Sequence, residues 1–427
     1  MESHPAISNE EWSLAVRRLL GDSVRFDLLS IDWGGQGSEV VGFQGDHFRV
    51  KLSVSVDGQQ PQEFNMFVKT VPVGSDFKTV FVVATNAYVK EISIYTSIFE
   101  EFRKYGLIPQ ETPWAPKCFL TRSDLLVMED LISAGFRMFN KFEYMDFPHC
   151  KIVLSTLARL HAASIIYEEK EKLRTGRNCS LNELFPVTLF ETMYPGDPEN
   201  VMSITMRTGI KSVLEMIKVM ENYGMKSKYL NTILQSFKQK AELIFEYVKP
   251  SNKYRNVVSH GDLWPNNLMF RYAENSGVPE EVRLVDYQMV RYAPPALDVM
   301  SFLHLVTNRE FRRNNLETLL SLYHGQLVRV LERHDVNVIP WEEFLESCRH
   351  YAQAARIIVP LIQHAVLLPD HLLATLLSTK ASYEKFILKD RGDVVVQCFK
   401  DVEYYKERLT GDIEELIEFV VLGLKSD

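Results

Sequence analysis

Apolar residues follow two different spacings along the chain, and the spacing changes near residue 140. In the first part, short apolar or alternating runs are typical of β-strands. These runs are FRVKLSV (48–54), EFNMFVKTV (63–71), KCFLTR (117–122) and DLLVMED (124–130). One longer segment, 86–104, repeats its apolar residues at the spacing of an amphipathic helix. The first part therefore predicts a sheet with one helix.

The remainder of the chain predicts mostly helices. Long segments with helical spacing cover 149–168, 199–222, 225–248, 311–334, 341–366, 371–388 and 401–424. One strand-rich island, 256–292, interrupts them, with expected strands at 268–271 and 282–286 around a turn rich in Asn, Gly and Pro. Strands followed by helices predict an α+β protein, with a small lobe at 1–130 and a larger helical lobe at 131–427.

Composition and charge exclude some classes of function. The chain has 427 residues, 46% of them hydrophobic and 24% charged, as in an ordinary globular protein. Lys and Arg total 48 against 56 Asp and Glu, which gives a net charge of -8. A general nucleic-acid binder needs a basic surface, so no nucleic-acid partner is expected. The sequence leaves the oligomeric state open.

The expected location is the cytoplasm. The five cysteines are widely spaced and lack metal-ligand spacing, which favours free thiols in a reducing compartment. The N-terminal residues predict a short amphipathic helix and contain no apolar signal core. The most apolar stretch, 357–377, is interrupted by prolines, histidines and an aspartate, which indicates a buried helix pair without contact to a membrane.

The candidate chemistry lies in the island. Charged and amide side chains gather at its strand ends: His260, Asp262, Asn266, Asn267 and Asp286. Carboxylate and amide oxygens suit a hard cation such as Mg²⁺. Phosphoryl transfer needs a metal to neutralise phosphate charge and a carboxylate to orient the attacking hydroxyl. The competing interpretation is a polar hairpin whose Asp and Asn side chains are simply solvated.

The spacing of these residues favours phosphoryl transfer. Asn267 follows the His260-x-Asp262 triplet by five residues, and Asp286 ends the next strand, as in kinase catalytic loops. On this interpretation Asp262 accepts the proton of the acceptor hydroxyl, and Asn267 and Asp286 bind Mg²⁺. His260 is expected to hold the loop by hydrogen bonding.

Two longer strings carry a family resemblance. VVSHGDLWPNNLMF (257–270) and VRLVDYQMVRYAPPALDVMSFL (282–303) resemble the ecdysteroid-kinase-like family, within the choline kinase and aminoglycoside phosphotransferase group. The resemblance implies a protein-kinase-like two-lobed fold and an ATP- and Mg²⁺-dependent kinase. It also implies that Asp298 braces the catalytic loop. Protein kinases would instead show Arg after the His and Phe-Gly after the metal-binding Asp.

The resemblance also implies a lysine–glutamate pair before the island. Lys69 ends an expected strand, where it would contact the nucleotide phosphates. On the helix 86–104, Glu91 falls within an apolar stripe, while Lys90 lies at or beyond its edge. The stripe consists of Tyr88, Ile92, Tyr95, Phe99 and Phe102. A core-facing carboxylate needs a partner, and Lys69 is the expected one; a surface lysine and a glutamate at the helix rim are the alternatives.

Two further segments are candidates for nucleotide contacts. The segment GGQGS contains Gly35, Gly37 and Ser38, whose backbone N–H groups would bind phosphate, although the family's usual loop has a different sequence. The segment DLLVMEDL resembles the family's hinge, where the backbone of Glu129 and Leu131 would bind adenine. A glycine-rich hairpin and a buried strand followed by a turn are the alternatives.

The expected substrate is a hydroxylated small molecule. The resemblance implies an ecdysteroid or a hydroxylated xenobiotic, and the apolar C-terminal helices suit a lipophilic alcohol. Acidic stretches would suit a choline- or aminoglycoside-type substrate, although they are also typical of solvated helix faces. The rival classes are an inactive kinase that binds nucleotide or a hydrophobic ligand, a protein kinase, and a helical interaction protein.

Overall fold

The structure of this protein is a computed structural model, and it describes residues 4–36, 45–72, 76–225, 227–274 and 276–423. The chain forms two compact units, each containing two stretches of the sequence. Unit 1 comprises residues 1–138 and 269–288, and unit 2 comprises residues 139–268 and 289–427. The division predicted after residue 130 stays a prediction, since these units divide the chain after 138 and group 269–288 with the first part.

Unit 1 is built on a five-stranded antiparallel sheet with the order β1-β2-β3-β5-β4. Its strands are β1 (Phe26–Gln36), β2 (Asp46–Val56), β3 (Gln62–Thr70), β4 (Cys118–Arg122) and β5 (Leu125–Glu129). The last four coincide with the four predicted runs. A smaller sheet of order β6-β8-β9 consists of β6 (Arg137–Met138), β8 (Leu268–Tyr272) and β9 (Pro279–Leu284).

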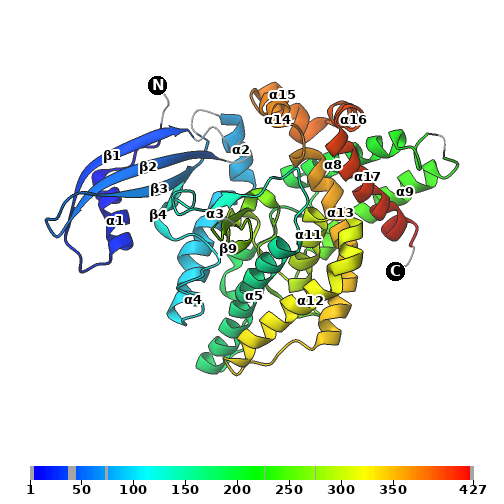
Figure 1. Cartoon of the computed structure of the whole chain (residues 1–427). Helices are drawn as coiled ribbons and strands as arrows, with labels where there is room; N and C mark the ends of the chain where they lie inside the picture. Colours follow the sequence, from blue (N-terminus) through cyan, green and yellow to red (C-terminus); the bar gives the residue numbers. More distant parts are fainter. Residues whose placement is uncertain (1–3, 37–44, 73–75, 226, 275, 424–427) are drawn as a thin grey trace. The chain divides into compact units, whose positions relative to one another are not determined.

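The alternation of side chains along β2 gives the large sheet one apolar face. Val50 and Leu52 are buried, whereas Arg49 and Lys51 between them are exposed. The first helix, α1 (Asn9–Leu20), covers this face and buries Trp12 completely (Figure 1). The predicted N-terminal amphipathic helix is therefore confirmed, and apolar burial between helix and sheet stabilises this half of unit 1.

The helical part of unit 1 is less regular than the sequence predicts. The segment 86–104 forms α3 (Ala87–Ser93), the π-helix η1 (Ile94–Ile98) and α4 (Phe99–Lys104), after α2 (Asp76–Ala84). The wider turn of a π-helix shifts the register, so that Ile94 and Ile98 are fully buried while Ile92 is only partly buried. The expectation that Lys90 lies at the edge of the apolar stripe is wrong, because this side chain is 1% exposed.

Unit 2 is mainly helical. Its helices of ten or more residues are α5 (Phe147–Thr175), α8 (Val201–Val219), α9 (Leu230–Ala241), α11 (Pro295–Val306), α12 (Arg309–Glu332), α13 (Trp341–Val366), α16 (Gly392–Asp401) and α17 (Glu403–Glu415). Its shorter helices are α6 (Leu181–Leu184), α7 (Pro186–Leu189), α10 (Ile244–Tyr247), η2 (Pro265–Asn267), α14 (Asp370–Leu376), α15 (Lys380–Glu384), η4 (Lys385–Lys389) and η5 (Leu416–Val421). The predicted α+β composition is confirmed.

The long helices of unit 2 pack in pairs. Helix α12 runs beside α5, and α13 packs against α11 (Figure 1). By length and composition α5 is apolar enough to cross a membrane, but 78% of its most apolar window is buried inside the structure, as in a core helix. The expected helix pair at 357–377 is present, since α13 and α14 meet at a bend of 84°.

Two short strands of unit 2 carry the loop with the candidate catalytic residues. β7 (Val257–Ser259) pairs antiparallel with β10 (Arg291–Ala293), and the sequence did not predict either of them. Both strands are completely buried. A three-residue strand has too few positions to show alternation, so a buried short strand resembles any apolar run in the sequence. The short helix η3 (Tyr287–Met289) precedes β10.

Candidate functional site

A buried lysine in unit 1 bridges two carboxylates that are distant in sequence. The Lys69 Nζ lies 2.6 Å from Glu91 Oε2 and 2.9 Å from Asp286 Oδ1. Lys69 comes from β3, Glu91 from α3, and Asp286 from the segment after β9. Glu91 is fully buried and Lys69 is 6% exposed, so the predicted pairing of these two residues is confirmed.

The charges in this group determine its protonation. Burial alone would lower the pKa of Lys69, but Asp286 and Glu91 outweigh burial and raise the pKa. Lys69 therefore keeps its proton. Burial raises the pKa of Glu91 against the opposing effect of Lys69. Burial and the charge of Lys69 together lower the pKa of His47, opposite Lys69 on β2, to about 4, so His47 is neutral near pH 7.

Two backbone features position this group. Asp286 has a φ angle of 64°, which is uncommon for a residue with a side chain and is typical of functional sites. Gly45, just before β2, lies so close to Tyr88 that a Cβ atom there would clash with the tyrosine hydroxyl and approach Thr70 O to 2.9 Å. Glycine is therefore required at position 45, next to the end of the strand that carries Lys69.

In unit 2, a hydrogen bond fixes the carboxylate of Asp262. The Asn267 Nδ2 donates to Asp262 Oδ2 at 2.7 Å and to the Asp262 carbonyl at 2.9 Å. The Asp262 N–H donates to His260 Nδ1 at 3.3 Å. His260 is fully buried, as expected for a residue that holds the loop. The five-residue spacing in the sequence therefore brings all three residues into one loop.

Asp298 braces this loop from α11, as the resemblance implies. Its carboxylate accepts hydrogen bonds from the N–H groups of His260 at 2.6 Å and Gly261 at 3.0 Å. The His161 Nε2 lies 3.4 Å from the same carboxylate, and Tyr323 Oη lies 2.6 Å from His161 Nδ1. Burial alone would raise the pKa of Asp298, but His161, His260 and the Gly261 N–H together lower it.

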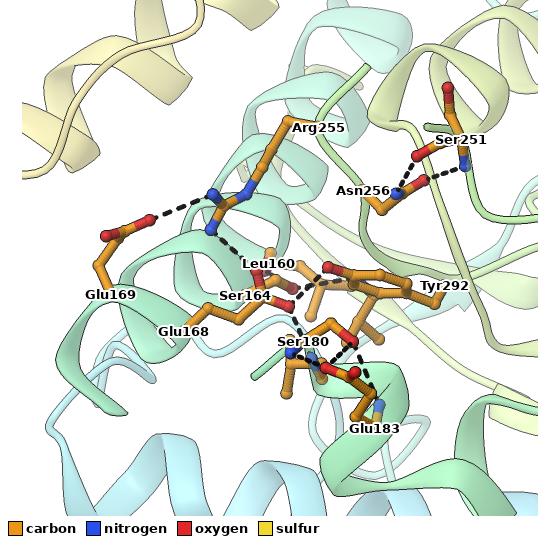
Figure 2. A network of polar contacts seen from close by, with 12 residues as sticks. Leu160, Ser164, Glu168, Glu169, Ser180, Glu183, Ser251, Arg255, Asn256 and Tyr292 are labelled. Carbon is orange, nitrogen blue, oxygen red and sulfur yellow. Dashed lines mark hydrogen bonds and ion pairs between the residues drawn. The ribbon is translucent and has the colours of Figure 1, made fainter. Parts of the chain in front are cut away.

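A second polar network connects α5 with the two short strands β7 and β10 (Figure 2). Glu168 of α5 accepts hydrogen bonds from the Leu181 N–H at 2.6 Å, Tyr292 Oη at 2.6 Å and Arg255 Nη2 at 2.8 Å. The Ser164 hydroxyl, also on α5, accepts from the Val258 N–H at 3.1 Å. Because Val258 and Tyr292 belong to β7 and β10, the network fixes the strands that flank the loop with His260 and Asp262.

The candidate nucleotide-contact segments are only partly described. Gly35 lies near the end of β1, whereas Gly37 and Ser38 lie outside the described residues. Glu129 ends β5, and its N–H donates to the Lys117 carbonyl at 2.9 Å. Leu131 follows in a turn that Asp130 stabilises by accepting the Ile132 N–H. Among the described residues, no acceptor takes the Leu131 N–H, and the adenine contact of this residue remains a prediction.

The described residues provide oxygen donors for a metal in two places. The Asn267 amide group donates through its nitrogen, and no described residue donates to its oxygen. Lys69 contacts Oδ1 of Asp286, and no donor among the described residues contacts Oδ2. Both oxygens are hard donors that fit Mg²⁺. Within the described ranges, no group of three His, Cys, Asp or Glu residues could hold a metal by itself.

Sequence reasoning missed three residues that support the loop with His260 and Asp262. His161 lies in the apolar helical string TLARLHAAS, where a histidine among apolar residues was the available signal. Gly261 has a φ angle of 79°, and a Cβ atom there would clash with the Met289 carbonyl. Arg291 is 3% exposed, and a charged residue in a short buried strand was the available signal.

Solved structures give only distant similarity. An aminoglycoside 2'-phosphotransferase-IIIa variant in complex with GDP matches with 11% identity and a TM-score of 0.41, covering 96% of this chain and 100% of that one. A microcompartment-associated aminopropanol kinase matches with 10% identity and a TM-score of 0.43, covering 95% of both chains. A comparison with curated proteins gives no match.

The sequence profile of a known family matches a large part of the chain. It extends from residue 42 to residue 336, which is more than half of the chain. The matched range includes Lys69, Glu91, Asp262, Asn267 and Asp286, so it spans both groups of residues described above. The chain belongs to the ecdysteroid kinase-like family.

Proposed function

We propose that this protein is an ATP- and Mg²⁺-dependent phosphotransferase that phosphorylates a hydroxyl of a small, lipophilic molecule, such as an ecdysteroid or a hydroxylated xenobiotic. The observation that carries the proposal is the ion-pair group of Lys69, Glu91 and Asp286. A buried lysine between a helix carboxylate and a metal-binding carboxylate is the arrangement that kinases use to hold nucleotide phosphates. Burying three charges in one group is costly, which supports a functional reason for keeping them.

The group in unit 1 has the charge that a metal–nucleotide complex needs. One lysine and two carboxylates give a net charge of -1, which favours the binding of a divalent cation. Asp286 and Asn267 would hold the metal through their oxygens, and Lys69 would contact the phosphates. When bound, Mg²⁺ would neutralise the charge of the transferred phosphate. The backbone of Glu129 and Leu131 and the segment with Gly35, Gly37 and Ser38 are proposed to bind the rest of the nucleotide.

The loop in unit 2 supplies the base. Asp262 accepts the proton of the acceptor hydroxyl as the oxygen attacks the terminal phosphate, while Asn267 holds one carboxylate oxygen in place. His260 and Asp298 keep the loop in the required conformation. Because orientation contributes a large part of phosphoryl-transfer catalysis, this bracing is part of the proposed mechanism.

The proposed setting is the cytoplasm, with no membrane or nucleic-acid partner. The five cysteines, all within the described residues, are unpaired, which supports a reducing compartment. The burial of α5 supports a role as a core helix. Fractionation of the cells that produce the protein, with detection by antibody, would test the location.

The function is tested with purified protein, Mg²⁺-ATP and a panel of acceptors. The panel contains 20-hydroxyecdysone, choline, kanamycin and 1-amino-2-propanol, and mass spectrometry detects any phosphorylated product. A product that requires both Mg²⁺ and an intact Asp262 supports the proposal and identifies the acceptor class. Tight nucleotide binding without any product would favour an inactive kinase that acts as a binding protein.

A further inference from the structure

A short segment between α7 and α8, which contains Glu191, Met193 and Tyr194, contacts the strand beside the catalytic loop through a buried ion pair. Glu191 follows α7, and its Oε1 accepts the N–H groups of Met193 at 2.8 Å and Tyr194 at 2.9 Å. Its Oε2 lies 2.8 Å from Arg291 Nε. This contact is an ion pair, because the two groups are not aligned for a hydrogen bond. The glutamate therefore orders the segment's backbone and joins it to Arg291.

Arg291 lies directly beside the catalytic loop. It belongs to β10 and pairs with Ser259, the last residue of β7 before His260. A Cβ atom at Gly261 would lie 3.3 Å from the Arg291 guanidinium carbon, so the guanidinium packs against the residue that precedes Asp262. Since Arg291 is 3% exposed, removing Glu191 would leave a buried cation without its carboxylate.

Tyr194 lies next to this pair. The Arg291 guanidinium carbon is 5.3 Å from the centre of the Tyr194 ring, and Tyr194 is 3% exposed. Burial raises the pKa of the Tyr194 phenol; Arg291 opposes the shift, and the negative charges of Glu191 and Asp262 add to it. The hydroxyl is therefore protonated near pH 7, and no described residue takes its hydrogen bond.

We propose that Tyr194 binds the acceptor, donating its hydroxyl hydrogen to an acceptor oxygen beside Asp262, and that Glu191 and Arg291 are positioning residues for it. The proposal rests on the proposed function, because it needs an acceptor next to Asp262. The segment itself contains no base or metal ligand of the reaction. It acts on the affinity for the acceptor and leaves the affinity for the nucleotide unchanged.

Tyr194→Phe is the direct test, because it removes one hydroxyl and keeps the ring. With each panel compound that the wild type phosphorylates, we expect the acceptor KM to rise about five- to tenfold, as for one lost neutral hydrogen bond. The KM for ATP and the slow hydrolysis of ATP without acceptor should stay unchanged. The matched control is Tyr383→Phe, on an equally buried ring in α15, for which no kinetic constant should change.

Glu191→Gln tests the positioning role. If Glu191 acts through Tyr194, Glu191→Gln alone should raise the acceptor KM. The double variant Glu191→Gln/Tyr194→Phe should then have an acceptor KM no higher than that of the more impaired single variant. Additive losses, or a raised KM for ATP, would show a structural role and overturn the inference. An unchanged acceptor KM in Tyr194→Phe would overturn it as well. Absence of any transfer by the wild type would instead reject the proposed function, and the inference with it.

Discussion

The two groups of candidate residues hold their carboxylates in different ways. In unit 1, the carboxylates of Glu91 and Asp286 are held by the full positive charge of Lys69. In unit 2, the Asp262 carboxylate accepts a hydrogen bond from the Asn267 amide. Unit 1 therefore concentrates charge, whereas unit 2 fixes orientation by hydrogen bonds.

This difference matches the two tasks of a phosphotransferase. Holding a metal and a phosphate needs opposite charges close together, which a buried ion-pair group supplies. A base needs a defined direction and must stay able to accept a proton, which an amide donor permits. Substitutions in the two groups should therefore have different effects on nucleotide binding and on transfer.

The largest expected effect comes from removing the charge of unit 1. Lys69→Met leaves Glu91 and Asp286 without their cation, and Glu91 is fully buried. We expect the free energy of unfolding to fall by about 3–5 kcal/mol, as for a broken buried ion pair. Transfer should fall at least a hundredfold because the phosphate contact is lost. Urea denaturation and a coupled ATP assay measure the two effects.

The matched control is Lys51→Met on the neighbouring strand β2. Lys51 forms an ion pair with Glu63 at 3.2 Å, and their side chains are 49% and 65% exposed. An exposed pair contributes at most about 1 kcal/mol, so stability and transfer should change little. Equal losses in the Lys51 and Lys69 variants would contradict the special role of the buried group.

A smaller effect is expected from the brace in unit 2. Asp298→Asn keeps the size of the side chain but removes the charge that accepts the N–H groups of His260 and Gly261. We expect the free energy of unfolding to fall by about 1–3 kcal/mol. Transfer should fall roughly tenfold to a hundredfold through misorientation of the loop. Mg²⁺-ATP affinity, measured by calorimetry, should stay within a factor of two.

The smallest expected effect concerns a second buried carboxylate of unit 2. Asp412 on α17 has an Oδ2 atom that is buried and without a hydrogen-bond partner in the described part of the chain. Burial raises the pKa of Asp412 to about 7, against the opposing charge of Arg408. Asp298 contrasts with Asp412, because His161, His260 and the Gly261 N–H lower its pKa against the effect of burial.

This contrast predicts a pH dependence of stability. Because the pKa of Asp412 is higher in the folded protein than the usual 3.8, protonation of Asp412 stabilises the folded protein. This stabilisation is fully present below pH 3.8 and is lost as the pH rises through 7. The free energy of unfolding of the wild type should therefore fall between pH 5 and pH 8. In Asp412→Asn this fall should be smaller by about 1–2 kcal/mol. Urea midpoints at four pH values measure this, and identical slopes for variant and wild type would contradict it.

Much of the fold and of the site could be predicted from local patterns. The strands of the large sheet alternate clearly because one face is buried under α1. Asp262 and Asn267 lie five residues apart, so their contact follows from the local sequence. The pairing of Lys69 with Glu91 could be predicted because a carboxylate in an apolar stripe needs a cation.

The remaining features depend on contacts that local spacing does not encode. Lys90 lies in α3, ahead of the π-helix η1, and its burial did not follow from the spacing of the apolar residues. His161 contacts Asp298 across 137 positions, and Arg291 contacts Glu191 across a hundred. A single sequence shows such residues only as charged or polar side chains in apolar surroundings, without naming their partners.

The most direct test of the account compares Asp262→Asn with Asp286→Asn in two measurements, Mg²⁺-ATP affinity by calorimetry and phosphate transfer with mass detection. Both variants should lose transfer at least a hundredfold, and only Asp286→Asn should also lose Mg²⁺-dependent nucleotide affinity. Transfer near the wild-type rate in Asp262→Asn, or equal loss of nucleotide affinity in both variants, would contradict it.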